Sequence, residues 1–257
     1  VIAGLVVIGG IKRIGKVTEK LVPIMAGLYI LGALIIFFFN FQQIPYVFGS
    51  IFASAFSFEA IGGGIGGVVV RQAVEIGFKR GVFSNEAGLG TAGIAQAAGQ
   101  STSPVFSGLV GMMGTFIDTI IVCTMTGLAI VVTGVWNSGA SGALLSTQGF
   151  EAAMPGVGKY VLALSLAVFA FTTILGWAYY GEKCWDYLVG TRAEKPFRLA
   201  WVLAVFCGAV VTLDFAWLVA DTLNALMAIP NLLSLLLLSP VIVQLTREYF
   251  SDQQTNN

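Results

Sequence analysis

Six long apolar stretches restrict this chain more than any other feature of its sequence. They lie at about residues 21–39, 45–70, 104–133, 155–181, 199–219 and 221–246. An apolar stretch of roughly 20 residues can cross the hydrocarbon core of a bilayer as a helix. Only 10% of the residues are charged and 57% are hydrophobic, whereas soluble domains carry about 25% charged residues. The sequence therefore predicts an all-α, multi-pass membrane protein.

The distribution of basic residues predicts how these spans are oriented. Twelve of the thirteen Lys and Arg residues fall in segments 10–20, 71–103, 182–198 and 246–257. The positive-inside rule places these segments, expected to be loops, in the cytoplasm. The opposite side is expected to hold Lys159 with the acidic residues Glu151, Asp214 and Asp221. We expect the chain to lie in the plasma membrane, and its net charge of zero indicates no nucleic-acid partner.

The beginning of the chain indicates how its parts are organised. Val1 opens an apolar run that is too short to cross a membrane and that lacks the charged region of a signal peptide. We therefore expect a C-terminal part of a longer membrane protein, whose N-terminal half is missing here. If the longer protein has two inverted repeats, residues 1–43 end the first, 44–250 form the five spans of the second, and 251–257 are a polar tail.

The second apolar stretch contains an ionisable residue and a glycine cluster at membrane depth. Residues 56–67 read FSFEAIGGGIGG, which places Glu59 beside five glycines. A buried glutamate and a helix interrupted by glycines are both costly in hydrocarbon, but both fit a break that lines a binding site. The alternative is that the glycines only allow close helix packing, which leaves Glu59 unexplained. Two strings match GxGxxG: Gly62, Gly64 and Gly67, and Gly88, Gly90 and Gly93. The first lies within a hydrophobic span and the second has no strand before it, so neither has the strand–turn–helix context of a nucleotide site.

Polar residues inside the third and fourth stretches suggest further sites. Asp118 lies near the centre of the third stretch, at helical spacing from Gly111, Gly114 and Thr115. It is expected to face the bundle, either as a structural residue bonded to nearby groups or in ion coupling. Thr172 and Thr173 lie well inside the fourth stretch. Their hydroxyls suit an oxygen cage for Na⁺, although intramembrane threonines also bond back to their own helix.

The segment after the broken stretch, GVFSNEAGLGTAGIAQAAG at residues 81–99, carries polar residues close to the expected cytoplasmic surface. Ser84 is expected to cap a short helix that follows it, with Glu86 in the first turn of that helix.

Four strings in the sequence resemble one family of transporters. They are RGVFSNEAGLGTA at 80–92, FIDTIIVCTMTGLAIVVTG at 116–134, FTTILGWAYYGE at 171–182 and ADTLNALMAIPNLLSLLLLS at 220–239. These strings are similar to those of the alanine or glycine:cation symporter family, also called the sodium:alanine symporters. The resemblance implies a leucine-transporter-type inverted-repeat fold of the APC superfamily. It also implies Na⁺-coupled import of alanine, glycine or another small neutral amino acid.

The resemblance also assigns roles to individual residues. It implies a substrate site made by Phe56, Ser57, Phe58, Glu59, Ala60, Gly62, Thr173 and Trp177. Thr172 and Thr173 are the implied Na⁺ ligands, and Asp118, Glu59, Asn85 and Glu86 are candidates for coupling or structural roles. The family's first broken helix, with its GTGNIAG-like segment, is not in this sequence. Family members often have a neutral residue, commonly glutamine, near the position of Glu59, which leaves the coupling ion open between Na⁺ and H⁺.

Other classes of function find less support in the sequence. The chain has no histidine, no cluster of metal ligands at recognisable spacing and no nucleophile paired with a base, so we expect no catalytic residues and no cofactor apart from Na⁺ as coupling ion. The alternatives that remain are a non-transporting or channel-like membrane subunit and an H⁺-coupled amino-acid transporter.

Overall fold

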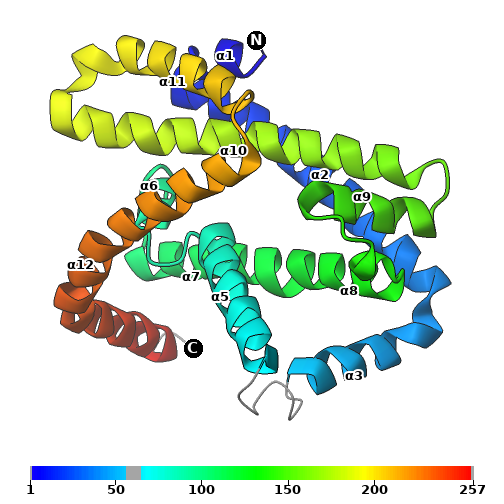
Figure 1. The fold of residues 1–257 in the computed structure, drawn as a ribbon. Helices are drawn as coiled ribbons and strands as arrows, with labels where there is room; N and C mark the ends of the chain where they lie inside the picture. Colours follow the sequence, from blue (N-terminus) through cyan, green and yellow to red (C-terminus); the bar gives the residue numbers. More distant parts are fainter. Residues whose placement is uncertain (1, 56–64, 256–257) are drawn as a thin grey trace. The chain divides into compact units, whose positions relative to one another are not determined.

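The computed structural model describes residues 2–55 and 65–255 and is helical throughout, with no strand in these two ranges (Figure 1). It divides into two compact units, residues 1–73 with 121–207 and residues 74–120 with 208–257. Four helical segments within the described ranges are long and apolar enough to cross a membrane, which confirms the expectation of a multi-pass helical protein. They are Gly10–Phe39, Pro104–Val132, Gly158–Val189 and Leu213–Asp252.

The elements follow one another in the order of the sequence, and three of the short ones are 3₁₀ turns. In chain order they are α1 (Ile2–Val7), α2 (Gly10–Phe39), η1 (Phe41–Gln43), α3 (Ile44–Ala55), α5 (Ile65–Asn85), α6 (Thr91–Ala97), α7 (Pro104–Phe116), the π-helical η2 (Ile117–Cys123), α8 (Thr124–Val132), η3 (Val135–Asn137), α9 (Gly142–Ala153), α10 (Gly158–Val189), η4 (Thr191–Ala193), α11 (Glu194–Gly208) and α12 (Leu213–Thr255).

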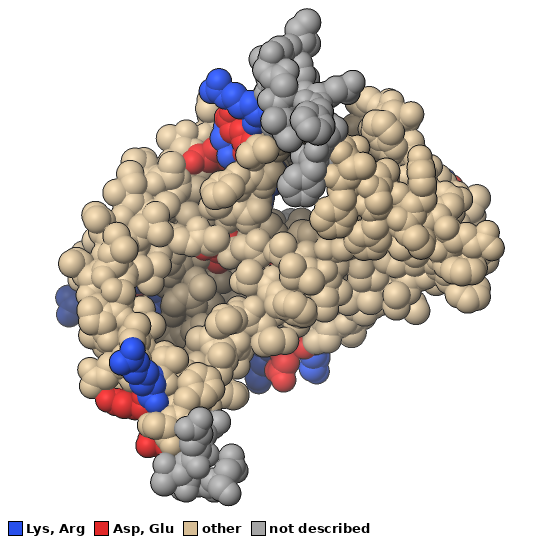
Figure 2. Space-filling view, turned by 90° about the horizontal axis from the view of Figure 1, so that it is seen from below, with Lys and Arg blue, Asp and Glu red and all other residues tan. Residues whose placement is uncertain are grey.

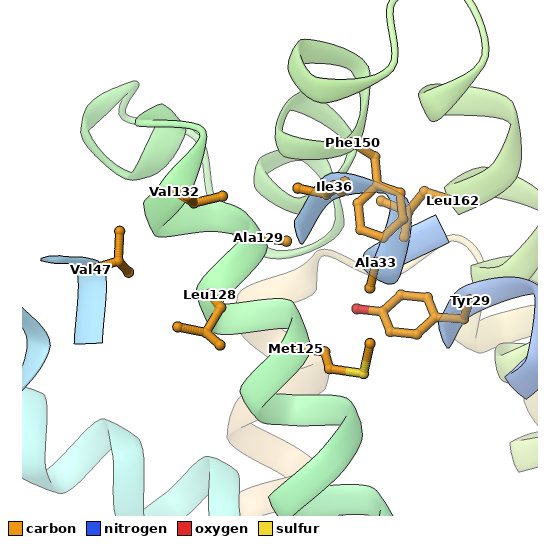
Figure 3. Packing of buried hydrophobic residues seen from close by; sticks show 10 residues of the cluster. All are labelled: Tyr29, Ala33, Ile36, Val47, Met125, Leu128, Ala129, Val132, Phe150 and Leu162. Atoms are coloured by element: carbon orange, nitrogen blue, oxygen red, sulfur yellow. The ribbon is translucent and has the colours of Figure 1, made fainter. Parts of the chain in front are cut away.

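The first unit is built around the packing of α2 against α10, with α8 and α9 beside them (Figure 1). Its main core buries one face of α2 and one face of α8, because the apolar residues of each recur at spacings of three and four. Figure 3 shows these side chains converging: Tyr29, Ala33 and Ile36 from α2, Val47 from α3, Met125, Leu128, Ala129 and Val132 from α8, Phe150 from α9 and Leu162 from α10.

Polar contacts fix the register of this core. The Tyr29 hydroxyl is hydrogen-bonded to the Thr126 hydroxyl, which joins α2 to α8. Thr126 in turn donates to the carbonyl of Val122, so neither hydroxyl is buried without a partner. Because lipid tails are as apolar as leucine, such contacts determine helix placement in a membrane more than apolar burial does.

The turn between α9 and α10 is organised by one carboxylate. Glu151 accepts hydrogen bonds from the backbone N–H groups of Gly156 and Lys159, at 2.8 and 3.1 Å. These bonds hold the pKa of the Glu151 carboxyl below its usual range. The carboxylate thereby satisfies the Gly156 N–H of the turn and the Lys159 N–H in the first turn of α10, and it complements the positive end of the helix dipole.

The second unit contains the C-terminal part of α5, the turn at 86–90, α6, α7 and α12. Ser103 caps α7, since its hydroxyl accepts a hydrogen bond from the Val105 N–H, and Pro104 occupies the first helical position. The turn leading into α6 depends on Gly90, whose φ of 87° favours glycine. A Cβ at this position would also lie 2.9 Å from Oδ1 of Asn231 in α12.

Large apolar side chains remain exposed along most helices, as expected for a protein embedded in lipid. Phe38 on α2 is 78% exposed and Leu237 on α12 is 80% exposed. Figure 2 shows few charged side chains on the face that it presents. The apolar window of α12 buries none of its residues within the described structure. This surface is compatible with hydrocarbon and not with bulk water.

The boundaries of the last two predicted spans are wrong. The sequence predicts spans at 199–219 and 221–246, but α11 ends at Gly208 and α12 begins at Leu213. Hydropathy alone cannot locate a break inside continuous apolar sequence. The signals that mark it are Gly208 at the end of one helix and Asp214 in the first turn of the next.

The expected cytoplasmic loops are also largely helical. Residues 10–20 belong to α2, 71–85 to α5, 182–189 to α10 and 246–255 to α12. Lys, Arg and Glu are good helix formers, so a helix continues beyond the apolar segment that crosses the membrane. The predicted break at Glu59 lies outside the described residues, which show α3 ending at Ala55 and α5 beginning at Ile65.

A glycine substitution tests the close approach of α9 and α10. A methyl group on Gly158 would overlap the Phe150 carbonyl oxygen, whereas one on Gly176 in the same helix would meet nothing within 4 Å. Gly158→Ala should therefore lower the free energy of unfolding by roughly 1–3 kcal/mol, while Gly176→Ala should be neutral or slightly stabilising. Thermal unfolding of both purified variants in detergent would measure this, and equal stability of the two would contradict the packing.

Candidate functional site

The residues predicted to bind substrate are described only in part. Phe56, Ser57, Phe58, Glu59, Ala60 and Gly62 all lie outside the described residues. Thr172, Thr173 and Trp177 lie on α10, in the first unit. The predicted substrate site therefore stays a prediction, and α10 is the part of it whose geometry can be examined.

Thr172 bonds back to its own helix, which is the alternative that its sequence left open. Its hydroxyl donates to the carbonyls of Val168 and Phe169, at 3.0 and 3.1 Å. A hydroxyl that donates its proton in this way keeps oxygen lone pairs that can face a cation. Thr173 is exposed and Trp177 packs edge-on against Tyr180, with ring centroids 5.8 Å apart. This arrangement is compatible with a Na⁺ ligand at Thr172 without requiring one.

The candidate coupling residues Asn85 and Asp118 are brought together at the end of α5. Asp118 accepts a hydrogen bond from the Ser84 hydroxyl at 2.6 Å, and Asn85 accepts one from the Thr119 hydroxyl at the same distance. Two consecutive residues of α5 thus bond two consecutive residues of η2. The bond from Ser84 is of the kind expected for a structural Asp118, and the choice between a structural and a coupling role stays a prediction. A π-helical segment is common at functional sites because it displaces side chains from regular helical spacing.

The prediction that Ser84 caps a following helix is wrong. Ser84 lies within α5, and α6 begins only at Thr91, after the turn at residues 86–90. Its hydroxyl is committed to Asp118, a residue 34 positions away in the sequence. The sequence prediction considered only nearby backbone N–H groups as partners of Ser84. In the structure its hydroxyl instead donates to a carboxylate that is distant in the sequence.

A cavity of about 760 Å³ adjoins this polar cluster in the second unit. Its walls combine small residues with amides and hydroxyls from α6, α7 and the end of α5. The lining residues are Asn85, Glu86, Ala87, Gly88, Ala92, Gly93, Gln96, Ala97, Pro104, Ser107, Gly108, Gly111, Met112 and Thr115. Most of the surface that lines the cavity is apolar.

Glu86 is the ionisable residue on this lining, and its position is unusual. It is the one non-glycine residue with positive φ in the described ranges, at 52°, a conformation that costs energy for residues with a Cβ. Its carboxylate accepts a hydrogen bond of 2.5 Å from the hydroxyl of Thr91, a residue that is 2% exposed. Burial raises the pKa of the Glu86 carboxyl, and the bond from Thr91 opposes this effect.

Helix α12 supports the same region through polar contacts. Arg80 of α5 pairs with both carboxylate oxygens of Asp221, at 2.5 and 2.6 Å, and its guanidinium lies 3.8 Å from the ring centroid of Trp217. Further along α12, the Asn231 amide donates to the Gly88 carbonyl at 2.9 Å. Helix α12 thus stabilises the turn at 86–90 through Asn231. The π-helical segment η2 stabilises the end of α5 through Asp118 and Thr119.

The contact with Arg80 corrects the predicted position of Asp221. The sequence places Arg80 and Asp221 on opposite sides of the membrane, which an ion pair of 2.5 Å excludes. Since α12 begins at Leu213, Asp221 lies about 12 Å along the helix and not in a loop. An ion pair between helices of a membrane protein indicates a functional or positioning role.

A second ion-pair network, in the first unit, was missed by sequence reasoning. Arg198 of α11 makes bonds of 2.6 and 2.8 Å to Glu182 of α10, which is only 4% exposed, and one of 3.0 Å to Glu194. It also donates to the Ile8 carbonyl at 3.2 Å. Carboxylate oxygens of Glu182, Asp186 and Glu194 lie close enough together to hold a metal ion. Basic side chains already occupy this group, because Arg198 pairs with Glu182 and Glu194, and Lys183 pairs with Asp186. The sequence signal that could have indicated this network is Glu182, an acidic residue directly after the apolar stretch 155–181.

The fold and these interhelical polar contacts define the class: a multi-pass helical membrane protein. Residues 1–257 match the sodium:alanine symporter family, and the chain belongs to that family. The resemblance seen in its sequence strings is thus confirmed.

Individual relatives agree with this assignment. The chain is 48% identical over 248 residues to the sodium/alanine symporter AgcS of Methanococcus maripaludis, covering 95% of this chain and 54% of the relative. It is 45% identical over 258 residues to an uncharacterized transporter of Haemophilus influenzae, covering 100% of this chain and 57% of the relative. It is 33% identical over 250 residues to the probable sodium/glutamine symporter GlnT of Bacillus subtilis, covering 96% and 51%. The chain spans about half the length of these relatives.

A double-mutant cycle tests the contact between Arg80 and Asp221. Removing either charge leaves its partner poorly compensated, so Arg80→Gln and Asp221→Asn should show a coupling free energy of roughly 1–2 kcal/mol. Denaturant titration in detergent micelles would provide the free energies of unfolding.

The exposed pair between Lys79 and Glu75 on the same helix is a matched control. The cycle of Lys79→Gln with Glu75→Gln should give a coupling below about 0.5 kcal/mol. Equal coupling in the two cycles would contradict a special role for the pair on α12.

Proposed function

We propose that this chain forms the C-terminal part of a Na⁺-coupled symporter that imports alanine or glycine across the plasma membrane by alternating access. The observation that carries the proposal is the match of the whole chain to the sodium:alanine symporter family, together with 48% identity to a sodium/alanine symporter. The four apolar helices fit a protein embedded in a bilayer. The family is one of symporters, and the proposal involves no catalytic residue.

The proposed architecture is the inverted-repeat fold, with residues 44–250 as the second repeat. Helices α3 and α5 would be the halves of its broken first helix, and they flank the predicted break on either side. Half-helix ends and loosened carbonyls at such a break bind polar substrates and ions in transporters of this kind. Because the relatives are about twice as long as this chain, residues outside it would complete the site.

The proposed roles of individual residues follow the same architecture. The backbone from Ser57 to Gly62, including Ala60, would bind the amino-acid zwitterion, while Phe56 and Phe58 would limit the size of its side chain. Thr172 and Thr173 would bind Na⁺, with Thr173 and Trp177 also bordering the substrate. Bound Na⁺ would then favour the state that accepts substrate, to the extent that it binds that state more tightly.

Uptake by proteoliposomes tests the proposal. The full-length protein that contains this chain, reconstituted with an inward Na⁺ gradient, should accumulate labelled alanine, and an equal K⁺ gradient should not drive accumulation. Excess unlabelled glycine and glutamine would define the substrate range. Accumulation driven by a pH gradient alone would replace Na⁺ by H⁺ as the coupling ion, and rapid equilibration without any gradient dependence would indicate a channel-like protein instead.

Substitution of the two threonines tests the Na⁺ site. Thr172→Val and Thr173→Val keep the side-chain volume but remove a hydroxyl oxygen, so each should weaken the apparent Na⁺ affinity of uptake by roughly tenfold.

Thr18 on α2 is a matched control, because its hydroxyl bonds back to the Ile14 carbonyl as that of Thr172 bonds to Val168. Thr18→Val should leave the Na⁺ dependence unchanged. Wild-type Na⁺ affinity in both Thr172→Val and Thr173→Val would exclude these hydroxyls as ligands.

A further inference from the structure

The N-terminal part of α2, before its apolar segment, carries a cluster of basic side chains. Residues 10–20 contain four basic residues and one acidic residue, Glu19, which gives this segment a net charge of +3. All five of these residues are exposed, and in the described part of the chain none of their side chains makes an ion pair or a hydrogen bond. The basic residues are Lys12, Arg13, Lys16 and Lys20.

The four basic residues share one face of α2, and packing fixes the direction of that face. Lys12, Lys16 and Lys20 recur at a spacing of four, and Arg13 lies three residues before Lys16. Residues at these spacings lie on the same side of an α-helix. Ile14 lies on the other side, where it is 6% exposed and packs into the apolar cluster formed with α1 and α10. The basic face therefore points away from the packed core of the first unit.

This basic face directly precedes a segment that can cross a membrane. Lys20 is followed by the apolar stretch at 21–39, which belongs to a helix long and apolar enough to span a bilayer. Lys12 lies about 12 Å further along the helix axis, at 1.5 Å per residue. The polar headgroup layer begins where the hydrocarbon ends, and long basic side chains extend their charged ends into it. The four cationic groups are therefore placed at the level of lipid phosphates or close to it.

We propose that the basic face of α2 binds anionic phospholipids of the membrane that this helix crosses. Charge complementarity carries the proposal, because the cluster has an excess of positive charge that the described residues leave uncompensated. Each basic residue beside a membrane helix strengthens the binding of anionic lipid by roughly fivefold, and four such residues suffice for recognition. The surface includes no residue assigned to substrate or Na⁺, so the inference goes beyond the proposed function and does not depend on it.

A simpler role for these residues is to orient the chain during insertion, as the positive-inside rule describes. The two roles differ in the folded protein. A signal for orientation makes no distinction between lipid headgroups after insertion, whereas a lipid-binding face prefers anionic to zwitterionic lipids. A segment of the longer protein that covered this face would also remove the preference.

Native mass spectrometry of the purified full-length protein tests the proposal, because it resolves single bound lipids. With dioleoyl-phosphatidylglycerol or dioleoyl-phosphatidylcholine added to the detergent, the wild type should bind the first anionic lipid at least about fivefold more tightly. Raising the salt concentration should reduce this difference. Combined replacement of the four basic residues by glutamine should abolish it. Equal affinity of the wild type for the two lipids, or an unchanged preference in the fourfold variant, would overturn the proposal.

Single substitutions keep the test decisive if the fourfold variant does not fold. Lys16→Gln should weaken phosphatidylglycerol binding by roughly fivefold, and Lys16→Arg should retain it because the charge is kept. Lys159→Gln is the matched control, because it removes the same charge from an exposed lysine at the beginning of α10, and it should bind as the wild type does. Unchanged binding in Lys16→Gln would overturn the site. Equal losses in Lys16→Gln and Lys159→Gln would also overturn it, because the effect would then come from net charge alone.

Discussion

The absence of hydrogen-bonding solvent in hydrocarbon is the constraint on which the rest of the structure depends. Every backbone N–H and C=O at membrane depth must be satisfied within the chain, and helices do this segment by segment. Once the helices exist, however, lipid offers little reason for one apolar face to prefer another. Specific packing therefore rests on small residues that allow close approach and on a few polar contacts, such as the bond between Tyr29 and Thr126.

Charge follows the same logic in both units. Arg198 with Glu182 and Glu194 joins α10 to α11, and Arg80 with Asp221 joins α5 to α12. An uncompensated charge in a partly buried position between helices is expensive, so these side chains are paired and hydrogen-bonded. Their value lies in specifying which helices meet and at what height. Glu86 differs from them because the described residues provide it with a hydroxyl and no opposite charge.

Much of the fold was predictable, because every membrane span needs a stretch of roughly 20 apolar residues, and hydropathy detects such stretches. The apolar stretches at 21–39, 104–133 and 155–181 correspond to the described helices α2, α7 to α8, and α10. Two of the misses have a common cause: contacts between distant residues leave no periodic signal. Ser84 looked like a local cap because its partner, Asp118, is 34 residues away, and Asp221 looked like a loop residue because Arg80 is 141 residues away. The break between α11 and α12 lies inside uninterrupted apolar sequence, where only Gly208 and Asp214 mark it.

The exposed apolar surface of α12 has a consequence for how this helix can move. Its exposed leucines would have similar free energies in lipid at many positions along the membrane normal. Apolar burial alone therefore does not determine the depth of α12. Asp221 and Asn231 do define one, because they meet Arg80 and the Gly88 carbonyl at positions ten residues apart. A slip by one helical turn, about 5.4 Å, would break both contacts together. These two contacts therefore favour discrete positions of α12 along its own axis relative to α5, and they oppose continuous sliding of the helix.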